Sequence, residues 1–130
     1  YAKGVQVWCA PTVDEREMWQ SSMRHIAHEG RVFLISACQV QPSPKVLGID
    51  VPHWDADRPL IQGNSVIMDP LGNILAGPLK HETGLLTARI DLAELTRARY
   101  DFDVVGHYAR PDIFTLTVDE REKKTVEFKT

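Results

Sequence analysis

Cys9 and Cys38 are the two cysteines of this 130-residue sequence and its best-suited side chains for covalent catalysis. A reactive thiol needs a positive, partly exposed environment that lowers its pKa. Cys9 instead lies between Trp8 and Ala10 in a strand-like run, without a basic residue beside it. Cys38 closes a fully apolar run. We therefore predict two buried, unpaired thiols and no catalytic residue in this chain.

His25 and His28 lie one helical turn apart, and Glu29 follows them. These residue types can bind a metal ion, but their order and spacing differ from the H-E-x-x-H pattern of helical zinc sites. The other three histidines are scattered along the chain and add no ligand pattern. We interpret the pair as surface or interface histidines, and we expect neither a metal site nor a cofactor.

The stretch from Thr12 to Val40 is predicted to fold as one amphipathic helix followed by one strand. Thr12 and Glu15 have the spacing of a capping box, and Gly30 stands where a left-handed glycine would end the helix. Between these signals, apolar residues recur with the period of a helix, at Trp19, Met23, Ile26 and Ala27. The pattern predicts a helix over residues 13–29 with one apolar side.

Two strands flank this helix. Residues 32–38 show no alternation of polar and apolar side chains, which is typical of a strand covered on both faces. Residues 5–9 alternate and predict an earlier strand. The connection is long enough to be a crossover between parallel strands. The sequence therefore predicts a strand–helix–strand unit whose sheet has a layer on each side.

The rest of the chain predicts short strands, one helix and irregular stretches. Residues 41–59 are rich in proline and aspartate but contain five larger apolar side chains, which favours an ordered loop over a floppy insertion. Residues 69–73 are a strong turn signal between two apolar runs and predict a hairpin. The other predicted elements are strands over 85–90 and 115–118, a helix over 92–99 capped by Asp91, and an exposed tail over 119–130. Together they predict one domain of the α+β class over residues 1–130.

Composition excludes several classes of partner. The chain is 43% apolar and 25% charged, with a net charge of −3, as in an ordinary globular domain. This charge gives no basic footprint for nucleic acid, and no apolar run approaches the length of a membrane span. The few, apolar-flanked cysteines favour a reducing, cytoplasmic setting. The chain begins at Tyr1 without an initiator methionine, which raises the expectation of a fragment.

Five sequence blocks cover most of the chain. They are YAKGVQVWCAPT (1–12), MRHIAHEGRVFLISACQ (23–39), GNSVIMDPLGNILAGPL (63–79), GLLTARIDL (84–92) and FDVVGHYARPDIFTL (102–116). In this order they resemble the carboxyl-terminal part of a nitrilase, from the carbon–nitrogen hydrolase superfamily. The RHIA-x-EGR and GHY-x-RPD blocks are the most specific, and the second points to nitrilases proper rather than to amidases.

The resemblance implies a fold and a chemistry. The family fold is an α-β-β-α four-layer sandwich, with helices outside two stacked sheets. In family enzymes a cysteine thiolate attacks the nitrile carbon, a glutamate acts as the base and a lysine stabilises the developing charge. Water then hydrolyses the thioimidate to acid and ammonia. None of the three residues can be placed here, because the family nucleophile lies in a C-W-E motif upstream of the stretch that matches residues 1–4.

The resemblance therefore implies that this chain is the part of a nitrilase that follows the nucleophile. Such a part would be inactive alone, and the amino-terminal half of the same enzyme would be its partner. Loops at the carboxyl ends of strands meet the ligand in open α/β sheets. This places Pro11 and Thr12, after the first strand, and Gln39, after the second, in the pocket of a small nitrile substrate.

Family enzymes also assemble as homo-oligomers, with dimers that stack into spirals. We expect Trp19 and Met23 of the helix, and Trp54 of the 41–59 loop, to lie at subunit contacts. Two alternatives stay open: a cyanide hydratase or dihydratase that shares these blocks, and a non-catalytic assembly module.

Overall fold

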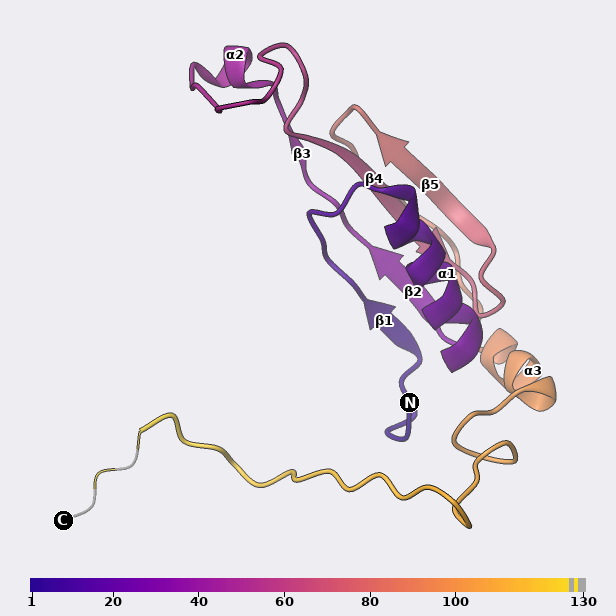
Figure 1. Cartoon of the computed structure of the whole chain (residues 1–130). Helices are drawn as coiled ribbons and strands as arrows, with labels where there is room; N and C mark the ends of the chain where they lie inside the picture. Colours follow the sequence, from indigo (N-terminus) through magenta and orange to yellow (C-terminus); the bar gives the residue numbers. More distant parts are fainter. Residues whose placement is uncertain (127, 129–130) are drawn as a thin grey trace.

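Five strands form one mixed sheet in the computed structural model, which describes residues 1–126 and 128 (Figure 1). The elements in chain order are β1 (Val7–Cys9), α1 (Glu17–Gly30), β2 (Phe33–Ser36), β3 (Val40–Gln41), α2 (Pro44–Leu47), β4 (Ile61–Met68), β5 (Ile74–Lys80) and α3 (Ala93–Asp101). The predicted α+β class, with a mixed sheet and helices outside it, is confirmed.

The predicted strand–helix–strand unit is confirmed, since β1 and β2 are parallel neighbours joined by α1. The strand order is β1-β2-β4-β3, and β5 also pairs with β4. All pairs that involve β4 are antiparallel. β2 and β4 therefore lie at the centre of the sheet. The regular part of β2 is shorter than the predicted 32–38.

The core lies between α1 and this central pair of strands. Met23 and Ala27 of α1 meet Leu34 of β2 and Val66 and Met68 of β4, and all five are at most 2% exposed. Partly buried Trp8, Trp19 and Ile26 pack around them. The helical period of apolar residues thus identified the buried side of α1 correctly.

The predicted capping box at the start of the helix is wrong. α1 begins at Glu17, its N-cap residue is Arg16, and no side chain caps it. The Thr12 hydroxyl accepts the N–H of Asp14 at 2.8 Å instead. The Glu15 carboxylate accepts the N–H of Gln62 in β4. Both predicted capping groups are used by other contacts, so the helix starts later than expected.

The predicted left-handed position at the end of the helix is also displaced by one residue. Gly30 is the last helical residue, and Arg31 is left-handed with φ of 47°. Gly30 packs closely on Tyr1, since a Cβ at this position would meet the Tyr1 ring. The Arg31 guanidinium donates to the His28 carbonyl at 2.9 Å and lies over the ring of Phe102. These contacts hold a conformation that only a few non-glycine residues adopt.

The hairpin of β4 and β5 is confirmed, together with its turn. One carboxylate oxygen of Asp69 accepts the N–H groups of Leu71 and Asn73 at 2.8 and 2.9 Å. Gly72 supplies the positive φ, 81°, that this turn requires.

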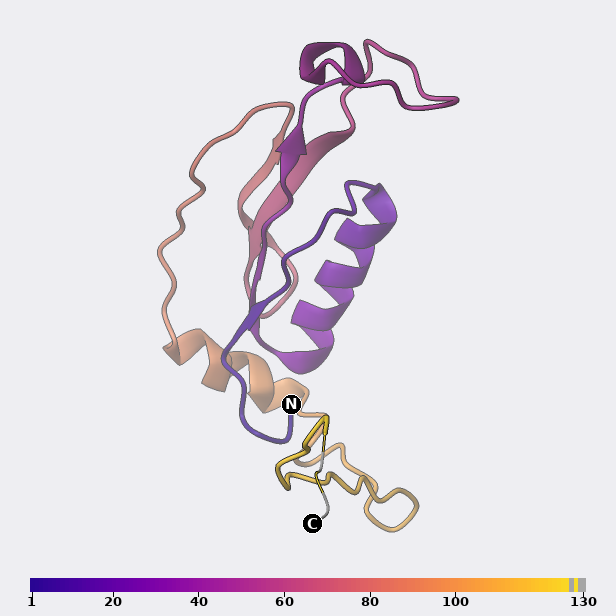
Figure 2. The ribbon, with the colours of Figure 1, turned by 90° about the vertical axis from the view of Figure 1, so that its left-hand side faces the viewer.

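The predicted strand over 85–90 is wrong, because these residues pair with no strand in the described part of the chain. Figure 2 shows the stretch between β5 and α3 running along the side of the sheet opposite to α1.

The 41–59 stretch is ordered and contains α2, a short helix that the sequence did not predict. It projects from one end of the sheet (Figure 1). The Trp54 indole N–H donates to the Arg58 carbonyl at 3.1 Å, and the Arg58 guanidinium lies over the Trp54 ring. The Lys45 N–H donates to the Ala56 carbonyl at 3.0 Å. The stretch is thus held by its own contacts.

The predicted helix over 92–99 is confirmed as α3, but its N-cap residue is Leu92 and not the predicted Asp91. The Asp91 carboxylate accepts the N–H of Ala93 at 2.9 Å. The predicted strand over 115–118 is wrong, since the chain there is extended but unpaired among the described residues. The tail 119–126 and residue 128 are exposed, as predicted, while residues 127, 129 and 130 lie outside the described range.

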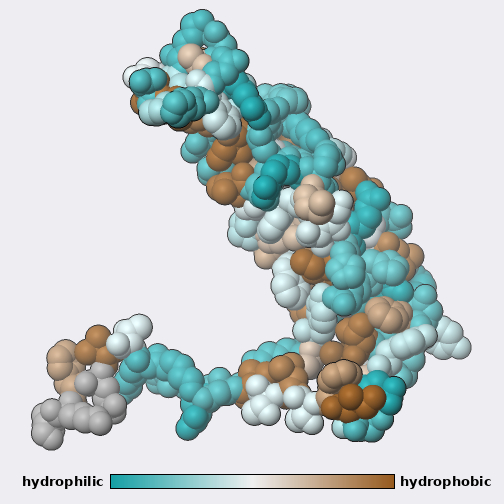
Figure 3. All heavy atoms as spheres, in the orientation of Figure 1, coloured by the Kyte–Doolittle hydropathy of each residue, from teal (hydrophilic) through white to brown (hydrophobic). Residues whose placement is uncertain are grey.

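The surface of the described residues gives two further observations. None of their helices has both the length and the apolar character that a bilayer span requires. On the α1 side, hydrophobic residues form separate patches among hydrophilic ones (Figure 3).

The position of the core leads to a first prediction. Leu34→Ala should lower the free energy of unfolding of the complete protein by about 2–5 kcal/mol, because it leaves a cavity under α1. The control Leu116→Ala removes a leucine that is 82% exposed and should stay within about 0.5 kcal/mol. Denaturant unfolding measures both. Equal losses in the two variants would contradict this placement of the core.

Candidate functional site

The carboxyl ends of β1 and β2 lie side by side and bring the three predicted pocket residues to one edge of the sheet. The Thr12 N–H donates to the Ala37 carbonyl at 2.9 Å, and Thr12 pairs with Cys38 in an isolated parallel bridge. Gln39 follows directly. Pro11 and Gln39 are exposed, and Thr12 is half-buried. Contact of these residues with a substrate remains a prediction.

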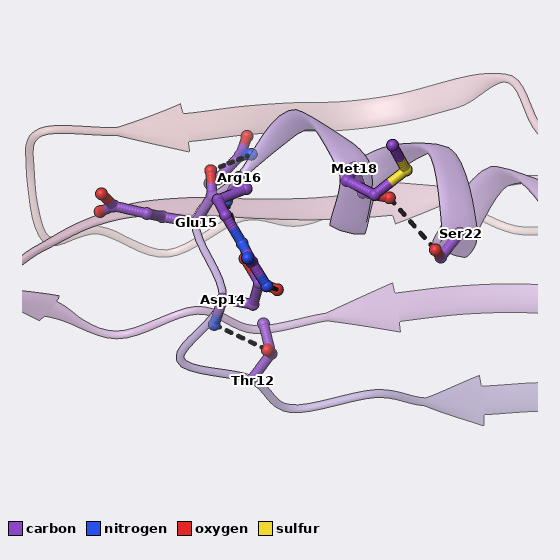
Figure 4. A network of polar contacts seen from close by, with 7 residues as sticks. Thr12, Asp14, Glu15, Arg16, Met18 and Ser22 are labelled. Carbon is purple, nitrogen blue, oxygen red and sulfur yellow. Dashed lines mark hydrogen bonds and ion pairs between the residues drawn. The ribbon is translucent and has the colours of Figure 1, made fainter.

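Side chains of the loop itself shape residues 12–16 (Figure 4). The Asp14 carboxylate accepts the Arg16 N–H at 3.0 Å and two guanidinium N–H groups at 2.8 and 2.5 Å. These bonds from Arg16 lower the pKa of Asp14 to about 2. Asp14 is therefore a carboxylate at neutral pH, and its charge is bound to its own neighbour rather than free for acid–base chemistry.

Cys38 is buried, as predicted, and is poorly suited to nucleophilic attack. Burial raises its pKa, and the negative charges of Glu15 and Asp14 raise it further. A thiol with a raised pKa carries little thiolate at neutral pH. The main chain of Cys38 is held by Ser65, whose hydroxyl accepts its N–H at 2.9 Å and donates to its carbonyl at 3.1 Å. Ser65 thus fixes the segment that follows β2 against β4, just before Gln39.

The predicted burial of Cys9 is wrong, because this thiol is exposed. Trp8 points to the core under α1, so the alternation along β1 turns Cys9 to the opposite face of the sheet. Cys9 pairs with Ile35, whose side chain is 39% exposed on that same face. No described segment covers these two residues. The prediction assumed a strand covered along both faces, whereas on this face Phe33 is buried and only Ile35 and Cys9 stay exposed.

A polar cluster ties the start of α1 to β4. The Glu15 carboxylate accepts the Gln62 N–H, and the Glu15 carbonyl accepts from the Asn64 side-chain amide at 3.0 Å. The Gln20 amide donates to the Asn64 carbonyl at 2.7 Å. Asn64 is only 1% exposed and has φ of 97°, which asparagine tolerates better than most residues. The cluster is next to the predicted pocket edge.

The three predicted interface residues occupy different environments. Trp19 is half-buried, and its indole N–H donates to the Ser36 hydroxyl at 2.9 Å. Met23 is 2% exposed in the core, which leaves it little surface to offer a partner. Trp54 is half-buried within the 41–59 stretch. A subunit contact at Trp19 or Trp54 stays a prediction.

The two histidines of α1 lie on its exposed side. His25 Nε2 is 3.8 Å from a carboxylate oxygen of Glu29, and His28 belongs to the same surface. Among residues 1–126 and 128, no three metal-ligating side chains come together. The arrangement agrees with our interpretation of surface histidines.

Sequence reasoning missed Glu15, Gln62, Asn64 and Ser65 as residues of this region. Gly63 and Asn64 together offered one signal, since both residue types accept positive φ, and the structure has 92° and 97° there. The partners themselves lie 27 to 49 residues apart in the chain, which no local pattern reveals.

Comparisons of this chain with a family model and with known proteins agree with one another. The family model described as carbon-nitrogen hydrolase matches residues 1–100. The chain is 47% identical over 129 residues to an aliphatic nitrilase of Sinorhizobium fredii, which covers 97% of this chain and 42% of that protein. It is 48% identical over 140 residues to nitrilase 1 of Arabidopsis thaliana, covering 100% of this chain and 40% of that protein. The chain thus spans about two fifths of the length of these relatives.

The fold has a solved counterpart as well. A carbon-nitrogen hydrolase from Helicobacter pylori G27 superposes with a TM-score of 0.64 at 20% identity. The match covers 86% of this chain and 40% of the other. At this identity the likeness concerns the fold, and it agrees with the nitrilase-like sandwich that the sequence blocks implied.

Ser65 gives the prediction for this region. Ser65→Ala should destabilise the complete protein by about 1–3 kcal/mol, because it removes the partner of both main-chain groups of Cys38. Ser22→Ala is the matched control, since the Ser22 hydroxyl donates only to the Met18 carbonyl on the exposed side of α1. That variant should stay within about 0.5 kcal/mol. Chemical unfolding compares the two, and an unaffected Ser65→Ala protein would contradict the role of this hydroxyl.

Proposed function

This chain belongs to the carbon–nitrogen hydrolase family, and we propose that it is the carboxyl-terminal part of a nitrilase that hydrolyses organic nitriles to carboxylic acids and ammonia. The observation that carries the proposal is the 47–48% identity to nitrilases over nearly the whole chain. The relatives are more than twice as long, so the activity proposed is that of a complete protein.

In the proposed mechanism, the catalytic cysteine, glutamate and lysine come from outside this chain. The sequence contains no C-W-E motif, which supports this division. Neither cysteine present offers a substitute. Cys38 is buried with a raised pKa, and Cys9 lies in β1 beside Ile35. The cysteine supplied by the other part would attack the nitrile carbon, and the thioimidate would be hydrolysed by water.

The amino-terminal half of the same enzyme is the partner that we propose for the open face of the sheet. Val7 and Ile35 on this face are 37% and 39% exposed, and the Cys9 thiol is exposed between them in the sheet. Within the described part of the chain, residues 84–90 make no main-chain hydrogen bond. Apolar side chains and free main-chain groups on one side of a sheet favour a further layer there.

The substrate pocket that we propose lies partly at the edge formed by Pro11, Thr12 and Gln39. Their position at the carboxyl ends of β1 and β2 supports this, as does the fixed geometry of both ends. A small nitrile would contact them only after the other half is in place. In this proposal, residues from both halves together determine the substrate specificity for nitriles.

We also propose that the complete protein forms homo-oligomers through the 41–59 stretch. The 41–59 stretch projects from the sheet and exposes Val46, Leu47 and Ile49 by 74%, 45% and 50%. A surface of this kind suits contacts between dimers in a homo-oligomer. The dimer contact that we propose at α1 uses the part of Trp19 that stays accessible beside the core. A reducing, cytoplasmic location fits the free thiols at Cys9 and Cys38.

Ammonia release tests the proposed function. The complete protein should release ammonia from aliphatic or aromatic nitriles, and the 130-residue chain alone should release none because it lacks the nucleophile, base and lysine. Amide formation from cyanide without ammonia would favour a cyanide hydratase instead. No turnover by the complete protein would favour the assembly module.

The variant Cys9→Ala tests whether the nucleophile lies outside this chain. In the complete protein Cys9→Ala should retain turnover, since Cys9 lies in β1, whereas the proposed nucleophile lies upstream of the stretch that matches residues 1–4. Loss of turnover in a folded Cys9→Ala protein would show that the nucleophile was placed wrongly.

A further inference from the structure

Residues 12–16 lead from the pocket edge to α1, and two strands anchor them. On one side the Thr12 N–H donates to the Ala37 carbonyl at 2.9 Å, at the end of β2. On the other side Glu15 makes two contacts with β4. Its carboxylate accepts the Gln62 N–H, and its carbonyl accepts from Asn64 at 3.0 Å.

The contact with Gln62 also reaches the second pocket segment. Gln62 pairs with Val40 of β3, and Val40 directly follows Gln39. The Gln62 N–H is taken by Glu15, while its carbonyl accepts the His81 N–H at 2.6 Å. Glu15 therefore connects the segment that carries Pro11 and Thr12 to the strand that holds Gln39.

We infer that Glu15 is a positioning residue for the nitrile pocket, acting through the Gln62 N–H to hold Thr12 and Gln39 in register. The inference rests on the proposed function and deepens it, because it assigns the geometry of the pocket edge to a residue that touches no substrate. Asp14 cannot replace Glu15 in this role, since its carboxylate is bound to Arg16.

The role requires a hydrogen-bond acceptor at the end of the side chain and does not require a negative charge. The carbonyl oxygen of a glutamine side chain can accept the same N–H. Glu15→Gln should therefore preserve the contact, whereas Glu15→Ala should remove it. This difference separates positioning from an electrostatic effect of the carboxylate.

Glu17 provides a matched control. It lies two residues further on, lines the same hollow of about 250 Å³ as Glu15 and Gln62, and pairs with Lys80 at 2.7 Å. Its side chain is 78% exposed and its carboxylate bonds no main-chain group in the described residues. Glu17→Ala thus removes a carboxylate from the same place without touching the anchor.

The experiment measures ammonia release and amide hydrogen exchange in the complete protein and in its variants. Glu15→Ala should lower kcat/KM for a nitrile about tenfold or more, because small displacements of a pocket edge are costly. Glu15→Gln and Glu17→Ala should stay within about threefold of the parent. The Gln62 amide should exchange about tenfold faster in Glu15→Ala alone, since only that variant frees it.

The outcomes separate the two proposals. Glu15→Ala activity within threefold of the Glu17→Ala control, or a Gln62 amide that stays protected in Glu15→Ala, would overturn the role of Glu15. A loss of activity in Glu15→Gln as large as in Glu15→Ala would overturn it too, because the charge would then matter more than the anchor. A parent that turns over no nitrile would overturn the proposed function, and Gln62 exchange would then decide the Glu15 contact by itself.

Discussion

The packing of α1 across β2 and β4 is the interaction on which the rest of the structure depends. Met23 and Ala27 of the helix close over Leu34, Val66 and Met68, all nearly inaccessible to water. Because β2 pairs with both β1 and β4, this contact fixes the register of the centre of the sheet. The carboxyl ends of β1 and β2 then meet at one edge, with the start of α1 beside them. The candidate pocket edge is a consequence of that core.

The same packing leaves part of the other sheet face open, although Phe33 on that face is buried. α1 covers the face of Leu34 and Val66, while Cys9 and Ile35 face the other way and remain exposed. Exposed apolar side chains on a sheet face and unpaired main chain over 84–90 are costly for a stable domain. A family of α-β-β-α sandwiches offers a direct physical explanation, in which a second sheet lies on this face. We propose that the part of the protein that supplies the nucleophile also covers this face.

Local sequence signals predicted the elements that local physics determines. The helical period of Trp19, Met23, Ile26 and Ala27 identified the buried side of α1, and residues 69–73 identified the hairpin. Because residues that follow parallel strands share one edge of a sheet, the sequence also placed Pro11, Thr12 and Gln39 correctly at one edge. Prediction failed where a distant partner decides: Glu15 bonds Gln62, 47 residues away, instead of capping the helix. The predicted strand over 85–90 pairs with no described strand. Arg31 rather than Gly30 takes the left-handed position, and its guanidinium donates to the His28 carbonyl.

This chain supplies one sheet covered by α1, and we propose that another part of the complete protein covers the other face. Amide hydrogen exchange on the 130-residue chain and on the complete protein tests it most directly. We predict weak protection over residues 32–38, 65–68 and 85–90 in the isolated chain, and strong protection of all three in the complete protein. A monomeric isolated chain that strongly protects these amides would contradict the account, because the sheet would then need no second layer.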